Sequence, residues 1–155
     1  MYDVIYIAKW FLSRDRMTDI MADSDGISNL KLQKLLYYAQ GTSLAIKGEG
    51  LFADALLAWT HGPVVERVYH LYKDYGSRPI DFDEGYDDSG ISSRDKSLLE
   101  DVYYSFAGYS AWKLREMTHN EDPWKLTPPG GVIDTGLIKD YFTREIINWD
   151  EYAEA

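Results

Sequence analysis

The sequence predicts a mainly α-helical protein, a compact single-domain bundle of about five to seven helices with a possible small antiparallel β-ribbon. Three observations predict this class. Apolar residues recur at three- and four-residue steps over most of the chain, which is the spacing of a helix face. Residues suited to helix starts and stops stand between these stretches. At 155 residues the chain can form a core without staples, so we treat 1–155 as one domain with a loose acidic tail at 148–155.

The first helix is predicted over residues 3–16. Its apolar positions at helical spacing are Val4, Ile7, Ala8, Phe11 and Leu12. Residues 18–26 are polar, so we expect a loop or a fraying extension of the helix there. Ser28 or Asn29 is suited to cap the next helix, because a short polar side chain can accept a hydrogen bond from a free N–H of the first turn.

The second helix is predicted from Asn29 to Lys47 and ends at Gly48. One face carries Leu32, Leu35, Leu36, Ala39 and Ser43, flanked by Leu30, Tyr37 and Leu44. This stripe is too wide for a lone surface helix, and we expect it to support the segment that follows. Gly41 costs about 1 kcal/mol relative to alanine inside a helix, and the usual reason for such a glycine is a close approach by another element.

Residues 58–65, Ala-Trp-Thr-His-Gly-Pro-Val-Val, are expected to form a sharp corner. Pro63 has a fixed φ and no N–H, so we predict that it occupies the first turn of a helix. Gly62 lies before a proline and can take backbone angles closed to other residues. The helix should end at Gly76. Its expected apolar face consists of Val64, Val68, Leu71, Tyr72 and Tyr75.

The segment before this corner is ambiguous. Residues 50–59 are apolar enough for a buried strand and alanine-rich enough for a short helix. We favour a brief helical or irregular piece that leads into an extended stretch at 58–60. Residues 78–82, with Pro79 at a place compatible with a sheet edge, could pair with that stretch as the antiparallel ribbon.

Three further helices are predicted in the second half. One starts at Ser92 or Ser93 with Asp95 completing the cap and closes at Gly108, and its apolar face carries Leu98, Leu99, Val102, Tyr103 and Phe106. Ser110 caps a short helix over 111–117, and residues 127–131 break the backbone. A last helix follows a Thr135 cap, with Leu137, Ile138, Tyr141, Phe142, Ile146 and Ile147 facing inward.

The composition limits the function. The chain has no cysteine, which excludes disulfides and thiolate chemistry and favours a cytoplasmic setting. It has no apolar run near the roughly 18 residues of a membrane span and no signal-peptide pattern. Against 16 Lys and Arg stand 26 Asp and Glu, a net charge of −10. Such a field repels phosphate backbones, so we expect a basic protein partner, with nucleic acid unlikely and no membrane.

The most acidic window is residues 81–88, where acidic and aromatic side chains alternate. We predict partner contacts from Asp81, Phe82, Asp83, Glu84, Tyr86, Asp87 and Asp88. Trp149 and Tyr152 in the tail are further interface candidates. The alternative for the window is a solvated loop without a partner, which is what most charge runs are.

The histidines could have either a catalytic or a structural role. His61 and His119 share their motifs with acidic residues, so a metal site or an acid–base pair is conceivable. No HExxH, no closely spaced ligand pairs and no Gly-rich phosphate loop is present, however. We therefore expect structural, hydrogen-bonded histidines, no catalytic residue, no metal and no cofactor. Trp59 and Trp124 are interpreted as core side chains.

Two ordered motifs carry a resemblance. Residues 31–41 (Lys-Leu-Gln-Lys-Leu-Leu-Tyr-Tyr-Ala-Gln-Gly), then Leu51-Phe52, then 58–65, and about fifty residues later 114–124 (Leu-Arg-Glu-Met-Thr-His-Asn-Glu-Asp-Pro-Trp), resemble the Panacea domain of SocA-like, phage-associated GepA-type antitoxins. The resemblance spans nearly the whole chain. The positions that match the motifs, interpreted as structural, are Leu35, Tyr38, Trp59, His61, Gly62, Pro63, Val64, Thr118, His119, Pro123 and Trp124.

The resemblance implies an antitoxin of a type II toxin–antitoxin system. Such a protein binds a toxin encoded beside it, without catalysis, and could form a heterotetramer or other hetero-oligomer with it. Toxins paired with the family include alarmone-synthetase-like enzymes and other inhibitors of translation. We expect blockade of the toxin's substrate site, led by the acidic window. The alternatives are a proteolytic adapter that delivers the toxin to a protease, as among SocA-like relatives, and an uncharacterised metal-dependent hydrolase.

Overall fold

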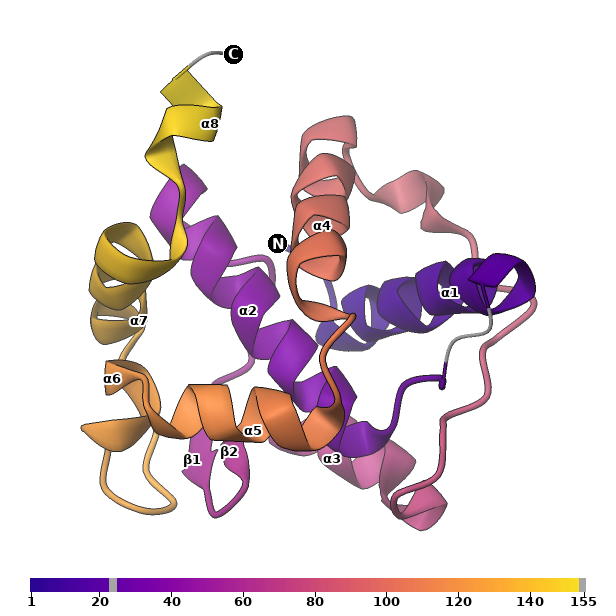
Figure 1. Ribbon diagram of the computed structural model, residues 1–155, viewed down its shortest axis with the longest axis horizontal. Helices are drawn as coiled ribbons and strands as arrows, with labels where there is room; N and C mark the ends of the chain where they lie inside the picture. Colours follow the sequence, from indigo (N-terminus) through magenta and orange to yellow (C-terminus); the bar gives the residue numbers. More distant parts are fainter. Residues whose placement is uncertain (23–24, 154–155) are drawn as a thin grey trace.

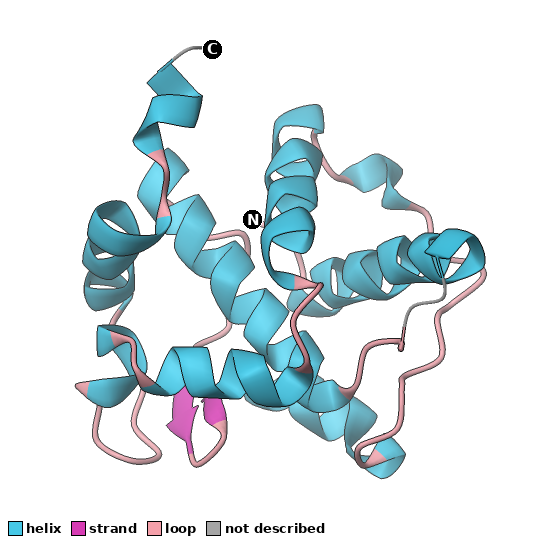
Figure 2. Ribbon diagram, in the orientation of Figure 1, coloured by secondary structure: helices cyan, strands magenta, loops and turns pink. Residues whose placement is uncertain are grey.

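The protein is a helical bundle built around one buried helix. The computed structural model describes residues 1–22 and 25–153, with side chains for 1–17 and 25–151. In this part of the chain, eight α-helices and one two-stranded sheet form, which confirms the predicted class (Figures 1 and 2). The helices are α1 (Val4–Ala22), α2 (Asn29–Lys47), α3 (Glu66–Tyr72), α4 (Ser93–Phe106), α5 (Ala111–His119), α6 (Asp122–Lys125), α7 (Thr135–Tyr141) and α8 (Trp149–Ala153).

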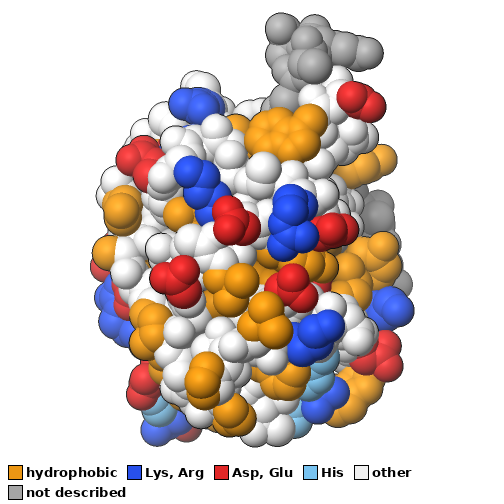
Figure 3. Space-filling model, turned by 90° about the vertical axis from the view of Figure 1, so that its left-hand side faces the viewer, with side chains coloured by type: hydrophobic (Ala, Val, Ile, Leu, Met, Phe, Trp, Pro, Cys, Tyr) orange, Lys and Arg blue, Asp and Glu red, His pale blue; other side chains and the backbone are white. Residues whose placement is uncertain are grey.

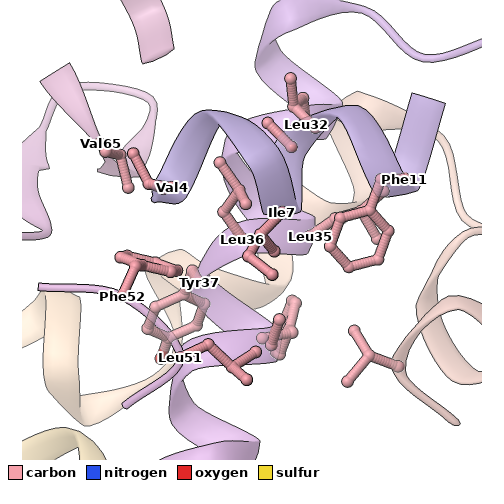
Figure 4. Packing of buried hydrophobic residues seen from close by; sticks show 14 of the residues in the cluster. Val4, Ile7, Phe11, Leu32, Leu35, Leu36, Tyr37, Leu51, Phe52 and Val65 are labelled. Carbon is pink, nitrogen blue, oxygen red and sulfur yellow. The ribbon is translucent and has the colours of Figure 1, made fainter. Parts of the chain in front are cut away.

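Helix α2 is the centre of the bundle, in contact with α1, α3, α4, α5 and α7. Every residue from 32 to 44 is buried, so the helix is covered all round rather than along one stripe. Its predicted ends are confirmed: Ser28 accepts a hydrogen bond from the Lys31 N–H, and Gly48 takes the left-handed conformation with φ 79°. Figure 4 shows side chains of α1 packed against Leu35 and Leu36 of α2.

Gly41 allows the closest contact with α2. A Cβ at this position would overlap the ring of Phe142, which is fully buried and begins a π-helical turn, Phe142–Ile146. The predicted close approach is therefore confirmed. The ring of Phe142 also meets that of Tyr37 edge-on, with 5.3 Å between centroids.

Polar side chains of α2 hold the irregular segment 49–65. Gln40 accepts from the Leu51 N–H at 2.8 Å and donates to the Phe52 carbonyl at 2.8 Å. Ser43 donates to the Glu49 carbonyl at 2.7 Å, and near the other end of the segment Gln33 accepts from the Val65 N–H at 2.8 Å. These bonds satisfy a buried backbone that has little regular structure of its own.

The sheet is a hairpin of β1 (Leu57–Trp59) and β2 (Gly62–Val64), with Ala58 opposite Pro63. The prediction that Pro63 begins a helix is wrong, because α3 starts at Glu66. Proline is tolerated in β2 because Ala58, which lies opposite it, does not require a hydrogen bond from its backbone. Ala58 exchanges both of its backbone hydrogen bonds with residues 130–131 on the other side, at 2.9 and 2.7 Å.

Residues 78–82 do not form the second strand of the ribbon, so this part of the prediction is wrong. The Ile80 N–H instead donates to the Ile27 carbonyl at 2.9 Å, next to the start of α2. Leu71 is also misplaced in the prediction, because 51% of it is exposed while Val68 and Tyr72 are buried. The end of this region at Gly76 is confirmed, since a 3₁₀ turn, Lys73–Tyr75, leads into Gly76 at φ 59°.

Several helix bounds differ from the predicted ones. Helix α1 runs to Ala22, six residues beyond the predicted end, and residues 23–24 of the expected loop lie outside the described residues. Helix α5 extends to His119. The cap of α7 is Asp134 rather than Thr135, since Asp134 accepts from the Leu137 N–H at 3.1 Å. The Ser92 cap of α4 is confirmed by its bond from the Asp95 N–H.

Two short helices, α6 and α8, were not predicted. Helix α6 falls inside the second motif, with Pro123 in its first turn. Helix α8 lies in the tail that was expected to be loose, and residues 154–155 are outside the described part of the chain. None of the helices in the described residues is both long and apolar enough to cross a membrane.

We expect Gly41→Ala to lower the free energy of unfolding by about 1–3 kcal/mol, because the added methyl group meets a ring in a packed core. The overlap involves three ring carbons of Phe142 and outweighs the roughly 1 kcal/mol that alanine gains over glycine in a helix. Gly108→Ala is the matched control, since a Cβ there meets nothing within 4 Å. Urea denaturation measures both, and equal stability of the two variants would contradict the tight contact.

Candidate functional site

The two sequence motifs meet in space at the hairpin. The Trp124 Nε1–H donates to the Trp59 carbonyl at 2.7 Å, across 65 residues of sequence. The Arg115 Nε–H donates to Nδ1 of His61 at 2.9 Å. The hairpin and the α5–α6 segment therefore form one structural unit, which we call the motif unit.

Gly62 is the point of closest packing in this unit. Its φ is 110°, a conformation that side chains with a Cβ rarely adopt, which confirms the predicted backbone. A Cβ at Gly62 would lie 2.7 Å from Cε of Lys34 and 2.8 Å from Oγ1 of Thr118. The position thus requires glycine for its backbone angle and for its space.

Lys34 lies fully buried beneath the hairpin. Its Nζ donates to the Pro63 carbonyl at 2.9 Å. Burial lowers the pKa of Lys34 to about 7, and the nearby charge of Arg115 acts in the same direction. Sequence inspection missed this residue because a lysine on a helix is ordinarily exposed.

The His119 side chain is positioned by contacts within the motif unit. Its ring stacks on that of Trp124 with 4.0 Å between centroids and a 17° angle. It bonds to the Thr60 backbone, and its buried Nε2 has no hydrogen-bond partner among the described residues. Burial, followed by the charge of Arg115, lowers the pKa of His119, so the imidazole is neutral at neutral pH.

His61 is exposed at the hairpin turn and accepts from Arg115 through Nδ1, so its neutral form carries the proton on Nε2. Its hydrogen-bond partner in the described structure is thus a side chain of α5. Among the side chains described, those of residues 1–17 and 25–151, no three from His, Asp or Glu gather as metal ligands would.

The motif positions differ in exposure. Seven are buried, three are partly exposed and His61 is exposed. The buried ones are Leu35, Tyr38, Gly62, Pro63, Val64, Thr118 and Pro123, and the partly exposed ones are Trp59, His119 and Trp124.

A buried carboxylate ties α2 to the second motif. Glu121 accepts hydrogen bonds from the hydroxyls of Tyr37 at 2.9 Å and Tyr38 at 2.8 Å, from more than 80 residues away. Burial raises the pKa of Glu121 to about 7, although both hydroxyls act to lower it. The only hint in the sequence was a pair of adjacent tyrosines within an apolar helix.

Beside the hairpin lies a groove of about 950 Å³, which we call the hairpin groove. Its walls come from β1, α3, the start of α2 and the segment around α6. Among its lining residues are Trp59, Tyr69, Trp124, Lys73, Lys125 and His61. No Asp or Glu is among the described residues that line it, which is unusual for a chain with a net charge of −10.

The acidic window lies elsewhere, on the chain that leads from α3 to α4 past α1, along the right edge of Figure 1. Asp81, Asp83, Glu84 and Asp87 are exposed. Lys9 lies 3.1 Å from Asp83, and a second pair joins Lys96 to Asp88 at 3.2 Å. The fold therefore neutralises part of the charge of the window.

The aromatic residues of the window anchor it to α1. The Tyr86 hydroxyl donates to the Tyr6 carbonyl at 3.0 Å, and the Tyr6 hydroxyl donates to the Asp87 carbonyl at 2.7 Å. Phe82 and Tyr86 are partly buried against the core. The window therefore presents mainly carboxylates to the surface, while its rings pack against the protein.

The tail candidates lie apart from the window. The indole of Trp149 is 42% exposed and donates to the Thr143 carbonyl at 2.8 Å. Tyr152 belongs to α8, but its side chain is outside the described part of the structure. Figure 3 shows the adjoining face of α6 and α7, where acidic, basic and single apolar side chains alternate without a large patch of one kind.

Sequence inspection missed a group of exposed aromatic residues at the α4–α5 corner. Tyr104 is 91% exposed, Trp112 57% and Tyr109 43%. The Arg115 guanidinium lies over the Trp112 ring, 4.3 Å from its centroid. The helical pattern gave Tyr104 and Trp112 outward positions, but no signal distinguished them from other surface residues.

Comparison with known proteins gives two findings. Residues 32–125 match the model of the family described as antitoxin SocA-like, Panacea domain. The chain is also 33% identical over 135 residues to "Antitoxin SocA" of Caulobacter vibrioides (strain NA1000 / CB15N), an alignment that covers 75% of this chain and 72% of the relative. No solved structure matches. The family match contains the hairpin, the acidic window and α6.

The Glu121 carboxyl should make stability depend on pH. The folded state holds its proton up to a pH of about 7, whereas an unfolded glutamate loses it near 4.3. Between these values the folded state binds more protons, so this residue makes the free energy of unfolding fall as the pH rises.

We therefore expect Glu121→Gln to gain stability relative to the wild type between pH 5 and pH 8, by on the order of 1–3 kcal/mol. Urea denaturation at several pH values measures the difference. Glu116→Gln, an exposed glutamate of α5, is the control and should show no such trend. A constant difference between Glu121→Gln and wild type over this range would contradict the buried carboxyl as the cause.

Proposed function

The chain belongs to the SocA-like Panacea family of antitoxins, and on this premise we propose that it neutralises a cognate toxin by binding it directly and covering its substrate site. The relative named "Antitoxin SocA" supports the antitoxin role. The mechanism is supported by one observation above all, an exposed acidic window fixed to the body of the protein.

Hydrogen bonds and an ion pair stabilise the charged form of two carboxylates of the window. The Gly85 N–H and then Lys9 lower the pKa of Asp83, and hydrogen bonds from Ser89 lower that of Asp87. The Asp81 carboxylate accepts a hydrogen bond from the Tyr75 hydroxyl at 3.3 Å. Neither Asp81 nor Glu84 forms an ion pair with the described residues, and both are exposed to a basic partner. These groups add to a net charge of −10, which accelerates encounter with a positive surface.

The window is also preorganised. Its C-terminal end is held by the Tyr6 and Tyr86 hydrogen bonds, and Ile80, which precedes it, donates its N–H to the Ile27 carbonyl. Binding therefore needs little further ordering of the backbone. A toxin that acts on nucleotides or RNA requires a basic groove for its substrate. A rigid row of carboxylates can enter that groove and exclude the phosphates that belong there. In this proposal the aromatic rings of the window position the carboxylates instead of contacting the toxin.

We expect Asp81→Lys/Glu84→Lys to slow association with the toxin encoded beside the gene by tenfold or more at low salt, and by less at high salt. Both residues are exposed and neither caps a helix, so the fold should persist. Glu49→Lys/Asp140→Lys changes the net charge equally, at exposed sites outside the window. Biolayer interferometry at two salt concentrations compares them, and equal association rates for the two variants would remove the window from the mechanism.

Blockade also predicts that the protein acts alone. Purified protein mixed with purified toxin should suppress the toxin's activity at equimolar concentration, with no protease present, and the toxin should remain full length on a denaturing gel. An assay with the toxin's substrate measures this. Toxin that stays active in the purified mixture yet disappears from cells expressing the antitoxin would support delivery to a protease instead.

A further inference from the structure

The hairpin groove is left unused by the proposed function, and its chemistry is opposite to that of the acidic window. Its charged lining residues are Lys73 and Lys125, which come from the turn after α3 and from α6. Both lysines are exposed, and neither forms an ion pair with the described residues. We propose that this groove binds an acidic, aromatic-bearing peptide segment of the neutralised protein.

The charge of the segment follows from the lining. The chain has 26 acidic and 16 basic residues, yet none of the described residues that line the groove carries a carboxylate side chain. The ammonium groups of Lys73 and Lys125, which come from different elements and form no ion pair with the described residues, attract carboxylates that enter the groove. A long phosphate backbone gains the same two contacts but also meets the negative field of the whole protein, which disfavours nucleic acid at this place.

The apolar part of the segment follows from the rings. Tyr69 meets Trp59 edge-on, with 5.0 Å between centroids and an angle of 74°. Trp124 is fixed by its bond to the Trp59 carbonyl and by its stack on His119. These side chains are ordered before anything binds, so an inserted aromatic or large aliphatic side chain gains contact without a large ordering cost.

The hairpin itself is not open to a further strand. The outer edge of β1 is bonded to residues 130–131, and beyond β2 the Pro63 carbonyl and the Val65 N–H are taken by α2. Recognition in the groove therefore relies on side chains, with a ring between the aromatic walls and carboxylates at the lysines. The volume of about 950 Å³ is large enough for a few residues of peptide.

This inference rests on the proposed function for the identity of the partner, but a peptide tests its chemistry independently. The probe is a fluorescein-labelled heptapeptide, Gly-Asp-Trp-Glu-Tyr-Asp-Gly, and its counterpart carries lysine at the three acidic positions. Fluorescence anisotropy should show at least tenfold tighter binding of the acidic peptide to the wild-type protein. Lys73→Glu/Lys125→Glu should reverse this preference, and Tyr69→Ala should weaken the acidic peptide severalfold.

The control is Lys139→Glu/Arg94→Glu, which makes the same change in net charge at exposed positions outside the groove. It should keep the wild-type preference. Circular dichroism and thermal melts establish that each variant is folded. Any of four results would overturn the inference. The first two are no binding of the acidic peptide at concentrations up to 1 mM and equal binding of both peptides. The other two are binding unaffected by Lys73→Glu/Lys125→Glu and tighter binding of a single-stranded oligonucleotide.

The toxin assay separates this inference from the proposed function. If the wild type neutralises the toxin, Lys73→Glu/Lys125→Glu should bind it at least tenfold more weakly than the control variant does. Equal binding by both variants would contradict the inference that the groove binds the toxin, but it would leave the antitoxin function intact. If the wild type does not neutralise the toxin, the proposed function fails, and the peptide measurements still decide whether the groove has the stated chemistry.

Discussion

The fold depends on hydrogen bonds from the buried helix α2 to the irregular backbone of residues 49–65. Buried N–H and C=O groups that no helix or strand pairing satisfies must find other partners, and in this segment the partners are side chains of Gln33, Lys34, Gln40 and Ser43. These four residues run along the helix in the opposite direction to the segment that they hold. The arrangement fixes the hairpin, and the hairpin in turn positions the second motif through the Trp124–Trp59 bond.

Local signals predicted much of this architecture. Capping side chains, a terminal glycine and the wide apolar stripe indicated the bounds and burial of α2. Gly41 indicated a close approach by another element, which the structure identifies as Phe142. Pro63 was misassigned because a fixed φ without an N–H suits both a helix start and a strand position that donates no hydrogen bond. The strand is favoured over the helix start by residues 130–131, which lie far away in sequence and form backbone hydrogen bonds with Ala58.

The candidate site was less predictable, because its important contacts join distant residues. The acidic window could be found from composition, but the ion pairs of Lys9 and Lys96 with it and the inward turn of Tyr86 could not. The hydrophobic pattern of the sequence also does not indicate that Lys34 and Glu121 are buried. Their burial depends on which helix faces cover them, and a charged residue on a helix is by default assigned to the surface.

A strongly acidic protein gains encounter rate from its net charge but little specificity, because any basic surface attracts it. Discrimination among partners requires a second feature that a merely basic protein lacks. The hairpin groove provides one, since Lys73 and Lys125 repel a positive segment while the rings around Trp59 accept an apolar one. Under the two proposals, a partner must present a basic groove and an acidic, aromatic segment at the correct separation. The rigid motif unit and the anchored window set that separation, which explains why both are tied so firmly to the buried core.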